Sequence, residues 1–411
     1  MQRFGLLGET LRHSFSPMIH AEFGKYEYKL YEKKPEELDV FFKQGDFDGL
    51  NITIPYKKSV IKYCKSLSVT AQAIGSVNTI IRHKDGTLHG DNTDLFGFTY
   101  LLERTGVQVA DGKTIILGSG GSSLAVQTVL KNKNAREVVV ISRSGAENYE
   151  NINKHNDAIL IINTTPVGMY PNNYASPIED LRIFNKCCTV IDLIYNPLRT
   201  ELMQQAKTLG IQSVNGLRML VAQAKGSAEH FLGSGIPDTT IENITTKIEQ
   251  STQNIVLIGM PGCGKTTIGK ALAKEMNRKF TDTDDTINEK AGKTPAEIIS
   301  ENGEGAFREL ETDALRTICK ENGLVIATGG GVVTRSLNQN VIKKNGIVIF
   351  LDRDLNKLQT KGRPLSKKEG IETLAAQRLP LYNKWCDYTV KSNEISQTMK
   401  DLKAIINRSK G

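Results

Sequence analysis

Short apolar runs alternate with amphipathic stretches along the whole chain, in the order expected of an α/β protein. In the first hundred residues, β-branched runs are separated by turn signals such as Gly45-Asp-Phe-Asp-Gly49 and Lys84-Asp-Gly86. After residue 112 the pattern predicts strands at 114–117, 138–142, 158–162 and 189–193, and helices at 122–131, 198–209 and 216–230. This order predicts a βαβ unit that continues into one nucleotide-type sheet.

The pattern breaks at residues 233–237 and starts again near residue 254. Asp238 is placed to cap a last helix that ends near Glu249, and residues 250–253 are polar and featureless, so we expect a domain boundary there. Beyond it the pattern predicts strands at 254–258, 325–328 and 348–351 and a helix at 265–276. Residues 361–370, rich in Lys, Gly and Ser, are expected to form a mobile lid.

Length and composition are those of an ordinary folded protein. The chain has 411 residues, of which 39% are apolar and 24% charged, and this length predicts two or three domains. The sequence has no apolar run long enough to span a bilayer, and polar residues interrupt the first 13 positions where a signal peptide needs an apolar stretch. Its six cysteines form no Cys-x-x-Cys pair. We therefore expect a cytoplasmic protein with free thiols and no membrane partner.

The net charge of +8 lies almost entirely in the C-terminal part. From Ser251 onward there are 26 Lys and Arg against 19 Asp and Glu, which accounts for seven of the eight charges. The chain has no block of Lys and Arg longer than three, and only 6% of its residues are aromatic. The excess therefore favours binding of small anions such as phosphates over a nucleic-acid partner.

A glycine loop near residue 260 has the spacing of a phosphate-binding loop. Gly259-Met-Pro-Gly-Cys-Gly-Lys265-Thr266 fits G-x-x-x-x-G-K-[ST], and it lies between a predicted strand and a predicted helix. Its backbone N–H groups would wrap phosphate oxygens, Lys265 would pair with the β and γ phosphates, and Thr266 would ligate Mg²⁺. The predicted ATP-binding residues are Gly262, Cys263, Gly264, Lys265, Thr266, Thr267 and Arg363.

Two carboxylates follow the first helix of this half. In Phe280-Thr-Asp282-Thr-Asp284 a strand would place Asp282 and Asp284 on one side, beside the phosphates. Asp282 would then hold Mg²⁺ together with Thr266, and Asp284 would orient an acceptor hydroxyl. Without the phosphate loop the same residues would be read as a solvated acidic turn.

Residues from 254 to about 410 resemble shikimate kinase. The resemblance rests on the loop, on Phe307-Arg308, on Gly329-Gly-Gly331, on Arg363-Pro-Leu and on Arg378-Leu-Pro-Leu-Tyr382. It implies that Asp284 is catalytic and that Arg363 reaches the phosphates. It also implies that shikimate is held by Asp284, Arg308, Gly329, Gly330, Gly331 and Arg378. A guanidinium suits the carboxylate of shikimate because its donors form a planar fork. The stretch from Arg363 to Arg378 is shorter than the family pattern.

A second glycine loop lies in the N-terminal half. Gly118-Ser-Gly120-Gly121 follows a predicted strand and opens a helix, although Ser123 stands where the usual dinucleotide fingerprint has its third glycine. The next strand ends in Ser142-Arg143-Ser144 instead of an acidic residue, which favours NADP over NAD. The expected NADP-binding residues are Gly118, Ser119, Gly120, Gly121, Ser122, Ser142, Arg143 and Ser144. Only 14 residues separate Arg143 from Ala158, too few for much helix.

Residues 1 to about 249 resemble shikimate dehydrogenase. The motifs are His13-Ser14-Phe-Ser16-Pro17, Asn51-Ile-Thr53-Ile-Pro-Tyr-Lys57, Val77-Asn78-Thr79, Gly90-Asp91-Asn-Thr-Asp94, Asn163-Thr-Thr165, Asp192-Leu-Ile-Tyr195 and Asn215 to Gln223. The resemblance implies a catalytic pair, Lys57 and Asp94, beside the carbonyl of 3-dehydroshikimate. The implied substrate-binding residues are Ser14, Ser16, Thr53, Lys57, Asn78, Asp94, Tyr195 and Gln223.

The two resemblances together imply a bifunctional enzyme of chorismate and aromatic amino-acid biosynthesis. It would reduce 3-dehydroshikimate to shikimate with NADPH, and then phosphorylate shikimate to shikimate 3-phosphate with ATP and Mg²⁺. The expected organisation is a dehydroshikimate-binding domain at 1–100 and 215–249, a Rossmann NADP domain at 101–214, and a P-loop kinase domain with a parallel sheet at 254–411.

Two alternatives remain open at this point. One is quinate reduction beside a less specific small-molecule kinase. The other is a nucleotide-regulated binding protein in which one half has lost its chemistry.

Overall fold

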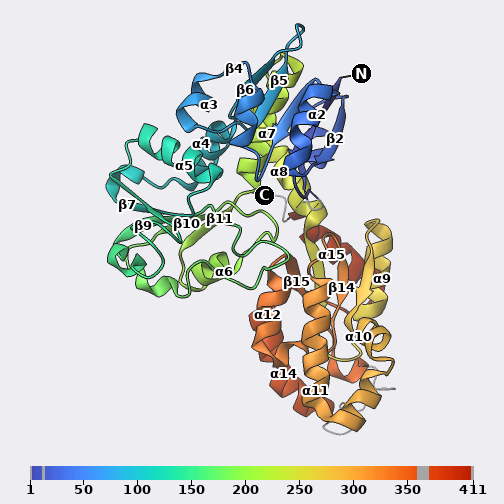
Figure 1. Ribbon diagram of the computed structural model, residues 1–411. Helices are drawn as coiled ribbons and strands as arrows, with labels where there is room; N and C mark the ends of the chain where they lie inside the picture. The colour runs from blue at the N-terminus through green and yellow to red at the C-terminus, as the bar shows by residue number, and fades with distance from the viewer. Residues whose placement is uncertain (1, 12–13, 359–369, 409–411) are drawn as a thin grey trace. The chain divides into compact units, whose positions relative to one another are not determined.

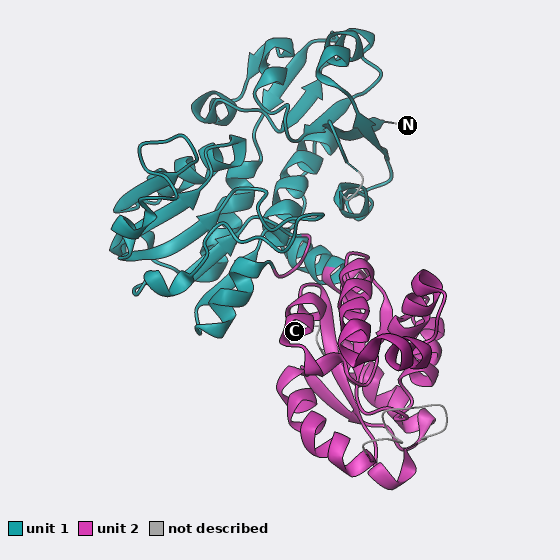
Figure 2. Cartoon of the chain, turned by 60° about the horizontal axis from the view of Figure 1, so that its bottom comes forward, with its two compact units in different colours: residues 1–195, 200–248 teal, residues 196–199, 249–411 magenta. Residues whose placement is uncertain are grey.

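The computed structural model describes residues 2–11, 14–358 and 370–408 and divides into two units. Unit 1 comprises residues 1–195 and 200–248, and unit 2 comprises residues 196–199 and 249–411 (Figure 2). Both units are built from sheets and helices that alternate along the chain (Figure 1). The α/β fold class predicted from the sequence is confirmed.

The first sheet of unit 1 is mixed and has six strands. Its order is β2 (Glu27–Glu32), β1 (Arg3–Gly8), β3 (Gly49–Ile52), β5 (Thr79–Arg82), β6 (Leu88–Asp91) and β4 (Ser66–Leu67). The strand pairs β3–β5 and β5–β6 are antiparallel, and the other pairs are parallel. Leu7, Phe47, Leu50 and Ile80 are fully buried in the core against this sheet. Residues 78 and 91–94, which follow or precede these strands, are thereby held at one end of the sheet.

The second sheet of unit 1 is parallel and has five strands. Its order is β11 (Gln212–Asn215), β10 (Thr189–Asp192), β9 (Ala158–Asn163), β7 (Lys113–Leu117) and β8 (Glu137–Ile141). Leu117 is paired with Ile141 on one side and with Asn163 on the other, so the loops after these strands meet at one edge. Between β8 and β9 only a short 3₁₀ turn, Ile152–His155, interrupts the loop, as the 14-residue spacing predicts.

Eight helices accompany the two sheets among the described residues of unit 1, and the last of them continues into unit 2 from residue 249. They are α1 (Ser16–His20), α2 (Leu38–Gln44), α3 (Val69–Ile74), α4 (Asp94–Thr105), α5 (Gly121–Asn132), α6 (Glu201–Thr208), α7 (Leu217–Leu232) and α8 (Thr239–Thr252). Helices α4 and α7 pack closely because Gly97 lacks a side chain, and a Cβ there would lie 2.7 Å from the carbonyl oxygen of Met219. This packing brings the first turn of α4 next to Gln223 on α7.

Unit 2 is built on a parallel sheet of five strands. Its order is β13 (Phe280–Asp282), β14 (Val325–Ala327), β12 (Asn254–Ile258), β15 (Gly346–Asp352) and β16 (Tyr388–Lys391). The helices are α9 (Lys265–Glu275), α10 (Thr283–Ala291), α11 (Pro295–Ile318), α12 (Ser336–Lys343), α14 (Ile371–Trp385) and α15 (Ile395–Arg408). The central strand β12 is buried throughout. Arg363 and nearly all of the expected lid lie outside the described residues.

The predicted strand through Asp284 is wrong, because β13 ends at Asp282 and α10 begins at Thr283. The reason is a local hydrogen bond that competes with the strand. The Asp282 carboxylate accepts from the backbone N–H of Asp284 at 3.0 Å and so caps the helix. Asp284 therefore projects from the first turn of a helix instead of from a strand.

The polar segment at 250–253 is also different from the prediction. Residues 250–252 are the last turn of α8, and a single residue separates this helix from β12. The helix end is held by unit 2, where the Arg278 guanidinium donates to the carbonyls of Gln250 and Gln253 and the Gly323 N–H donates to that of Thr252. The polarity of the side chains at 250–253 predicts no structure there, because the hydrogen bonds that hold the segment are made by its backbone carbonyls.

Residues 196–199 belong to unit 2 although they follow β10 in the chain. The Leu198 N–H donates to Asn345 Oδ1 at 2.7 Å, and the Arg199 guanidinium donates to the Gly346 carbonyl at 2.7 Å. These bonds hold residues 198 and 199 outside a helix, so α6 begins at Glu201 and not at the predicted residue 198. Thr200 caps it by accepting from the Met203 N–H.

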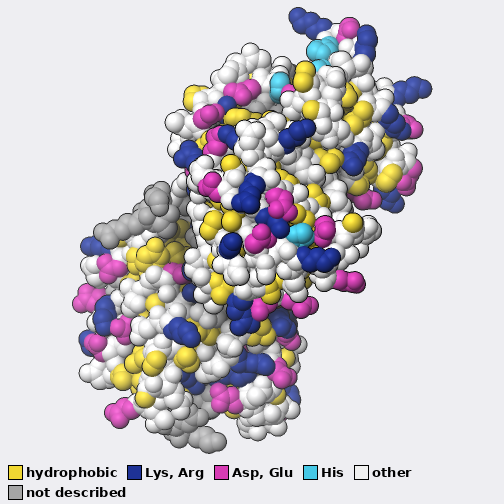
Figure 3. Space-filling view, turned by 90° about the vertical axis from the view of Figure 1, so that its left-hand side faces the viewer, with side chains coloured by type: hydrophobic (Ala, Val, Ile, Leu, Met, Phe, Trp, Pro, Cys, Tyr) yellow, Lys and Arg dark blue, Asp and Glu magenta, His cyan; other side chains and the backbone are white. Residues whose placement is uncertain are grey.

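The surface carries charges of both signs. On the face seen in Figure 3, acidic and basic side chains are interspersed and do not form one continuous basic field. None of the helices that the structure describes is long and apolar enough to cross a membrane. All six cysteines are free.

Candidate active sites

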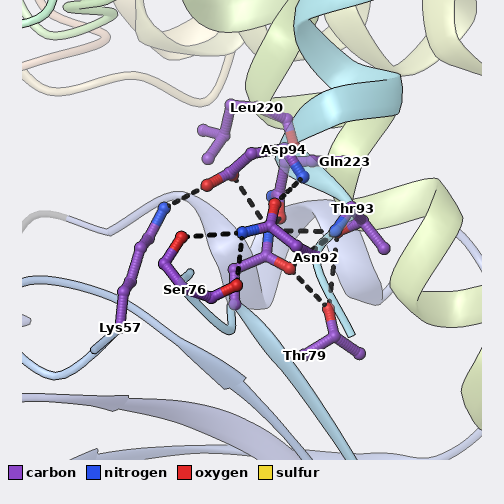
Figure 4. A network of polar contacts seen from close by, with 9 residues as sticks. Lys57, Ser76, Thr79, Asn92, Thr93, Asp94, Leu220 and Gln223 are labelled. Atoms are coloured by element: carbon purple, nitrogen blue, oxygen red, sulfur yellow. Dashed lines mark hydrogen bonds and ion pairs between the residues drawn. The ribbon is translucent and has the colours of Figure 1, made fainter. Parts of the chain in front are cut away.

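Lys57 and Asp94 form an ion pair among mostly buried polar side chains of unit 1. Nζ of Lys57 donates to Oδ2 of Asp94 at 2.5 Å, and their side chains are 14% and 6% exposed (Figure 4). Asp94 starts α4, and its backbone N–H donates to Oδ1 of Asn92. An ammonium held by a shielded carboxylate is suited to stabilise negative charge on a neighbouring oxygen.

Asn78 connects the ion pair to the helix that carries Gln223. Its Nδ2 donates to Oδ1 of Asp94 at 2.9 Å and lies 3.4 Å from Oε1 of Gln223. Its Oδ1 accepts from the backbone N–H of Thr93 at 2.8 Å. Asp94 thus has one oxygen on Lys57 and the other on Asn78, so its orientation is fixed from two sides.

The remaining predicted substrate residues lie at element ends of the same unit. The Ser16 N–H donates to Oγ of Ser14 at 3.2 Å, where α1 begins. Phe15, between them, packs its ring 5.2 Å from that of Tyr195, and burial raises the pKa of Tyr195 to about 12. Thr53 follows β3 and donates its N–H to the Leu7 carbonyl. Tyr195 is thereby connected to the Ser14–Ser16 segment, and Lys57, Asn78, Asp94 and Gln223 form the second group.

The glycine loop after β7 adjoins the ion pair. A Cβ on Gly121 would lie 3.6 Å from Cδ of Lys57, so the loop and the lysine approach each other closely. Gly118 has φ +101° and faces the Thr164 hydroxyl, a conformation and proximity that favour glycine. Helix α5 starts at Gly121 with no side-chain cap, which leaves its first N–H groups available to a phosphate. The expected loop residues Ser119 and Ser122 belong to this same turn.

Ser123, in the third glycine position, is fully buried and accepts from Gln127 Nε2 at 3.1 Å. A small polar residue, Ser123, therefore replaces the third glycine at the start of α5. At the end of β8, Arg143 and Ser144 are exposed, and the Ser142 N–H donates to the Glu147 carbonyl. Among the ion pairs of the described residues none involves Arg143, so its guanidinium is available to an anion.

A cavity of about 790 Å³ in unit 2 is lined by residues of both the predicted ATP-binding set and the predicted shikimate-binding set. The predicted residues that line it are Gly262, Gly264, Lys265, Thr266, Thr267, Asp282, Asp284, Arg308, Gly329, Gly330, Gly331 and Arg378. Cys263 is the exception, because its side chain is fully buried and its Sγ lies 3.8 Å from Nζ of Lys265 instead of facing the cavity. Only its backbone can contact a phosphate.

The phosphate loop and Asp282 provide groups suited to a triphosphate and a metal ion. Nζ of Lys265 donates to the carbonyls of Gly259 and Met260 at 2.8 and 3.0 Å. Thr266 Oγ1 donates to Asp282 Oδ2 at 2.8 Å, so a hydroxyl and a carboxylate stand together at the helix start. Oxygen donors of this kind suit Mg²⁺.

Asp284 and Arg308 meet at the other end of this cavity around a third charged group, Glu311. Burial and the charges of Asp282 and Glu311 raise the pKa of Asp284 to about 6. Glu311 is fully buried, accepts from Arg308 Nη1 at 2.9 Å, and has its pKa raised by burial. Among the described residues, Oδ1 of Asp284 and Oε1 of Glu311 have no hydrogen-bond partner. Buried carboxylate oxygens without a partner fit a ligand that brings hydroxyl donors.

Three consecutive glycines, Gly329 to Gly331, leave space for the charged side chains of Arg308 and Glu311. A Cβ on Gly331 would lie 1.9 Å from Nη2 of Arg308, and one on Gly329 would lie 2.4 Å from Oε1 of Glu311. Gly330 accepts from the Tyr382 hydroxyl. Arg378 is buried at the cavity wall, and its Nε has no partner among the described residues. Side chains at these glycines would displace the charged groups.

Two sets of residues were missed by reading the sequence. Glu311 lies three positions after Arg308 on α11, a spacing that places two side chains on one helix face and could have identified the pair. Asn92 and Ser76 support Asp94, since Asn92 Nδ2 donates to the Ser76 carbonyl at 2.9 Å. No local signal identifies Ser76, because the contact depends on the pairing of β5 with β6.

Comparison with known families gives two matches, one in each part of the chain. Residues 6–80 match the shikimate dehydrogenase substrate binding domain, and residues 261–409 match shikimate kinase. The NADP⁺-dependent shikimate dehydrogenase of Clostridium perfringens is 34% identical over 270 residues, which cover 61% of this chain and 99% of that protein.

Solved structures resemble the same N-terminal part. A chorismate mutase/shikimate 5-dehydrogenase fusion protein from Clostridium acetobutylicum has 34% identity and a TM-score of 0.57, covering 61% of this chain and 98% of that one. Shikimate 5-dehydrogenase from Thermus thermophilus, in complex with NADP(H) and shikimate, has 30% identity and a TM-score of 0.55, covering 60% of this chain and 99% of that one.

Proposed function

The chain belongs to the shikimate dehydrogenase family and carries a shikimate kinase domain at residues 261–409, and from this premise we propose residue roles for both reactions. The first is reduction of 3-dehydroshikimate to shikimate with NADPH. The second is transfer of a phosphoryl group from ATP to the 3-hydroxyl of shikimate, with Mg²⁺. The observation that carries the proposal is the presence in one chain of the Lys57–Asp94 pair and of the cavity that joins Lys265 to Asp284 and Arg308.

In the dehydrogenase, Lys57 acts on the carbonyl oxygen of the substrate. NADPH supplies the hydride when bound, and negative charge then develops on that oxygen. The Lys57 ammonium stabilises this charge and donates a proton to it, while Asp94, 2.5 Å away, keeps the ammonium in place. Ser14, Ser16, Thr53, Asn78, Tyr195 and Gln223 hold the rest of the substrate.

The glycine loop after β7 would hold the phosphates of NADPH. The N–H groups at the start of α5, which no side chain caps, would bind the pyrophosphate. The loop residues proposed for this contact are Gly118, Ser119, Gly120, Gly121 and Ser122. Arg143, with Ser142 and Ser144, would hold the 2′-phosphate. An exposed guanidinium with no acidic partner among the described residues supports the preference for NADP, and the residue directly after β8, Ser142, is not an acid that could bind a ribose hydroxyl.

In the kinase, the loop at 262–267 and Lys265 bind the phosphates of ATP. Thr266 and Asp282, whose oxygens lie 2.8 Å apart, would hold Mg²⁺. To do so, the Lys265 ammonium leaves the carbonyls of Gly259 and Met260 and pairs with phosphate oxygens. Arg363, outside the described residues, is proposed to add a further positive charge.

Shikimate lies at the Asp284 end of the same cavity. Arg308 and Arg378 bind its carboxylate, and Gly329, Gly330 and Gly331 provide a flat surface beneath its ring. Asp284 accepts a hydrogen bond from the reacting hydroxyl and orients it toward the γ-phosphate. Glu311 holds Arg308 in this position through the 2.9 Å hydrogen bond.

An omission experiment tests both activities at once. The purified full chain is supplied with 3-dehydroshikimate, NADPH, ATP and Mg²⁺, and NADPH loss and ADP formation are recorded after leaving out each component. ADP formation is expected to depend on NADPH when 3-dehydroshikimate is the starting substrate, and to become independent of NADPH when shikimate is supplied directly. Quinate is the matched alternative substrate.

The outcomes separate the proposal from the alternatives. NADPH loss without ADP formation would remove the kinase half of the proposal, and the reverse would remove the dehydrogenase half. Turnover of quinate equal to that of shikimate, in the oxidative direction with NADP⁺, would favour the related-substrate reading. Binding of both substrates with no turnover would favour a sensor.

A further inference from the structure

Arg353 follows β15 directly and lines the kinase cavity beside the phosphate loop. A Cβ built on Gly264 would lie 3.8 Å from Nη1 of Arg353 and 3.7 Å from Oγ of Ser392. The Ser392 hydroxyl donates to the Cys263 carbonyl at 2.8 Å, and its N–H donates to the Asp352 carbonyl at 2.7 Å. Arg353 therefore lies where the ends of β15 and β16, which are paired, meet the loop.

The charge of Arg353 has no acidic partner in the described part of the chain, although an aspartate stands on each side of it in the sequence. Asp352 pairs with Lys391 at 2.6 Å, and Asp354 pairs with Lys357 at 3.2 Å. Arg353 is half-buried, and its Nε is buried with no hydrogen-bond partner among the described residues. A part-buried charge without a counter-charge is unfavourable. This place in the cavity therefore suits an anionic group of a ligand.

The neighbourhood of Gly264 indicates which part of the nucleotide supplies this anion. Gly264 is the N-cap of α9, and the backbone N–H groups at this point of a phosphate loop hold the α- and β-phosphates. Arg353 lies near Gly264, whereas the groups proposed for shikimate surround the glycines at 329–331. The base of the nucleotide is the other candidate for this contact, but a neutral base would leave the guanidinium charge without a counter-charge.

We propose that the Arg353 guanidinium binds the α- and β-phosphates of the nucleotide, and so sets the affinity of unit 2 for ATP and ADP alike. The guanidinium presents several N–H donors in one plane, a geometry that suits phosphate oxygens. The inference rests on the proposed kinase function, and it assigns Arg353 a role that the sequence motifs do not give it.

The two phosphates that Arg353 binds do not change during the reaction. ATP and ADP both carry them, so the contact is the same in the substrate complex, the transition state and the product complex. An interaction of this kind lowers the KM for ATP and does not raise kcat. Arg353 is therefore a binding residue, whereas Lys265 and Asp284 act on the phosphoryl group that is transferred and on the hydroxyl that receives it.

The test compares Arg353→Ala with Lys274→Ala in the full chain. Arg353→Ala should raise the KM for ATP and the Kd for ADP by the same factor, about tenfold or more, as for loss of a hydrogen bond between charged groups. Its kcat should fall less than twofold, and its KM for shikimate should not change. Lys274→Ala removes an exposed positive charge of α9 that does not line the cavity, and should change neither nucleotide constant. Arg353→Lys, which keeps the charge without the planar fork, should recover part of the affinity.

The dependence of ADP binding on salt separates a contact to the phosphates from one to the base. Salt screens the attraction between a guanidinium and a phosphate, so the ratio of the Kd of Arg353→Ala to that of the wild type should shrink as NaCl is raised. Isothermal titration calorimetry measures both constants. A ratio above one that stays constant with salt would assign Arg353 to the base and overturn the proposal. A kcat lowered tenfold or more with unchanged ADP affinity would place Arg353 at the γ-phosphate and would also overturn it.

The binding measurement keeps this inference separate from the proposed kinase function. Wild-type protein that binds ADP but does not phosphorylate shikimate would refute the kinase function, and the ADP affinities would still decide the role of Arg353. Unchanged ADP affinity in Arg353→Ala would refute the role of Arg353 while phosphorylation continues. Arg353→Gln keeps the polarity and most of the length of the side chain without its charge, and gives the same comparison if Arg353→Ala fails to fold.

Discussion

Asn78 stands between Asp94 and Gln223, and its single amide nitrogen lies 2.9 Å from the aspartate and 3.4 Å from the glutamine. The two partners come from different helices, and Gln223 is 145 positions away from Asn78 in the chain. The contact joins Asp94, at the start of α4, through Asn78 to α7, so the orientation of Asp94 depends on the packing of both helices.

The ion pair predicts the effect of two substitutions on reduction. Lys57→Ala and Asp94→Asn should each lower dehydrogenase turnover by about a hundredfold or more, because the first removes the proton donor and the second removes the charge that holds it. NADPH oxidation measures the loss, and shikimate phosphorylation should be unchanged. Lys58→Ala, at an exposed neighbouring position, is the control. Near-normal reduction by both variants would contradict the catalytic assignment.

The exposed arginine after β8 predicts cofactor choice. Arg143→Ala should raise the KM for NADPH much more than the KM for NADH, by about tenfold or more, because only NADPH carries the 2′-phosphate. Steady-state kinetics with each cofactor measures the ratio. Arg136→Ala, another exposed arginine just before the same strand, should leave it unchanged. Equal effects of Arg143→Ala on both cofactors would refute the role.

The kinase cavity predicts two further losses. Lys265→Ala and Asp284→Asn should each reduce phosphorylation of shikimate by about a thousandfold or more, the first through lost phosphate contact and the second through lost orientation of the hydroxyl. ADP formation is the measurement, with NADPH-dependent reduction as the internal reference. Lys274→Ala, exposed on the same helix as Lys265, should behave as wild type. Retention of activity in either active-site variant would place the chemistry elsewhere.

The raised pKa of Asp284, about 6, predicts opposite effects of pH on activity and stability. Phosphorylation should rise with pH through about 6, because the carboxylate must be ionised to accept the hydroxyl hydrogen. Stability should fall over the same range, since the folded state binds a proton that the unfolded state, with a pKa near 3.8, releases. Between pH 4 and 6 the loss is expected to be on the order of 1 to 3 kcal/mol.

Asp284→Asn provides the control for this pH dependence. Chemical denaturation of unit 2 at a series of pH values should show a shallower pH dependence in Asp284→Asn than in the wild type. Identical slopes in the two proteins would mean that Asp284 titrates at an ordinary value and that another group sets the activity profile.

The contacts at the end of α8 predict where a separate kinase fragment should begin. A fragment of residues 249–411 should melt about 5 °C or more above a fragment of residues 254–411, because the shorter one removes the carbonyls that accept from Arg278 and Gly323. Both should phosphorylate shikimate, since every predicted kinase residue lies beyond 254. Differential scanning calorimetry measures the difference. Arg278→Ala should make the difference between the two melting temperatures smaller. Equal melting temperatures of the two fragments with Arg278 in place would contradict the prediction.

The sequence determined most of what lies in contiguous segments. The phosphate loop at 259–266 and the glycine loop at 118–121 were predicted with their flanking strands and helices, because their chemistry depends on the local backbone of adjacent residues. The strand pattern also predicted the α/β class and the short crossover before β9.

Only the tertiary structure decided how distant groups satisfy one another. The contact of Asn78 with Gln223, 145 positions away in the chain, follows from the packing of the folded unit and is not predicted by side-chain type alone. The late start of α6 and the extra turn of α8 depend on hydrogen bonds to side chains more than 25 residues away, those of Asn345 and Arg278. A helix end or a buried carboxylate is stabilised by the groups that lie next to it in the folded chain. The order of the strands in the sheet decides which groups those are, and the local sequence does not specify that order.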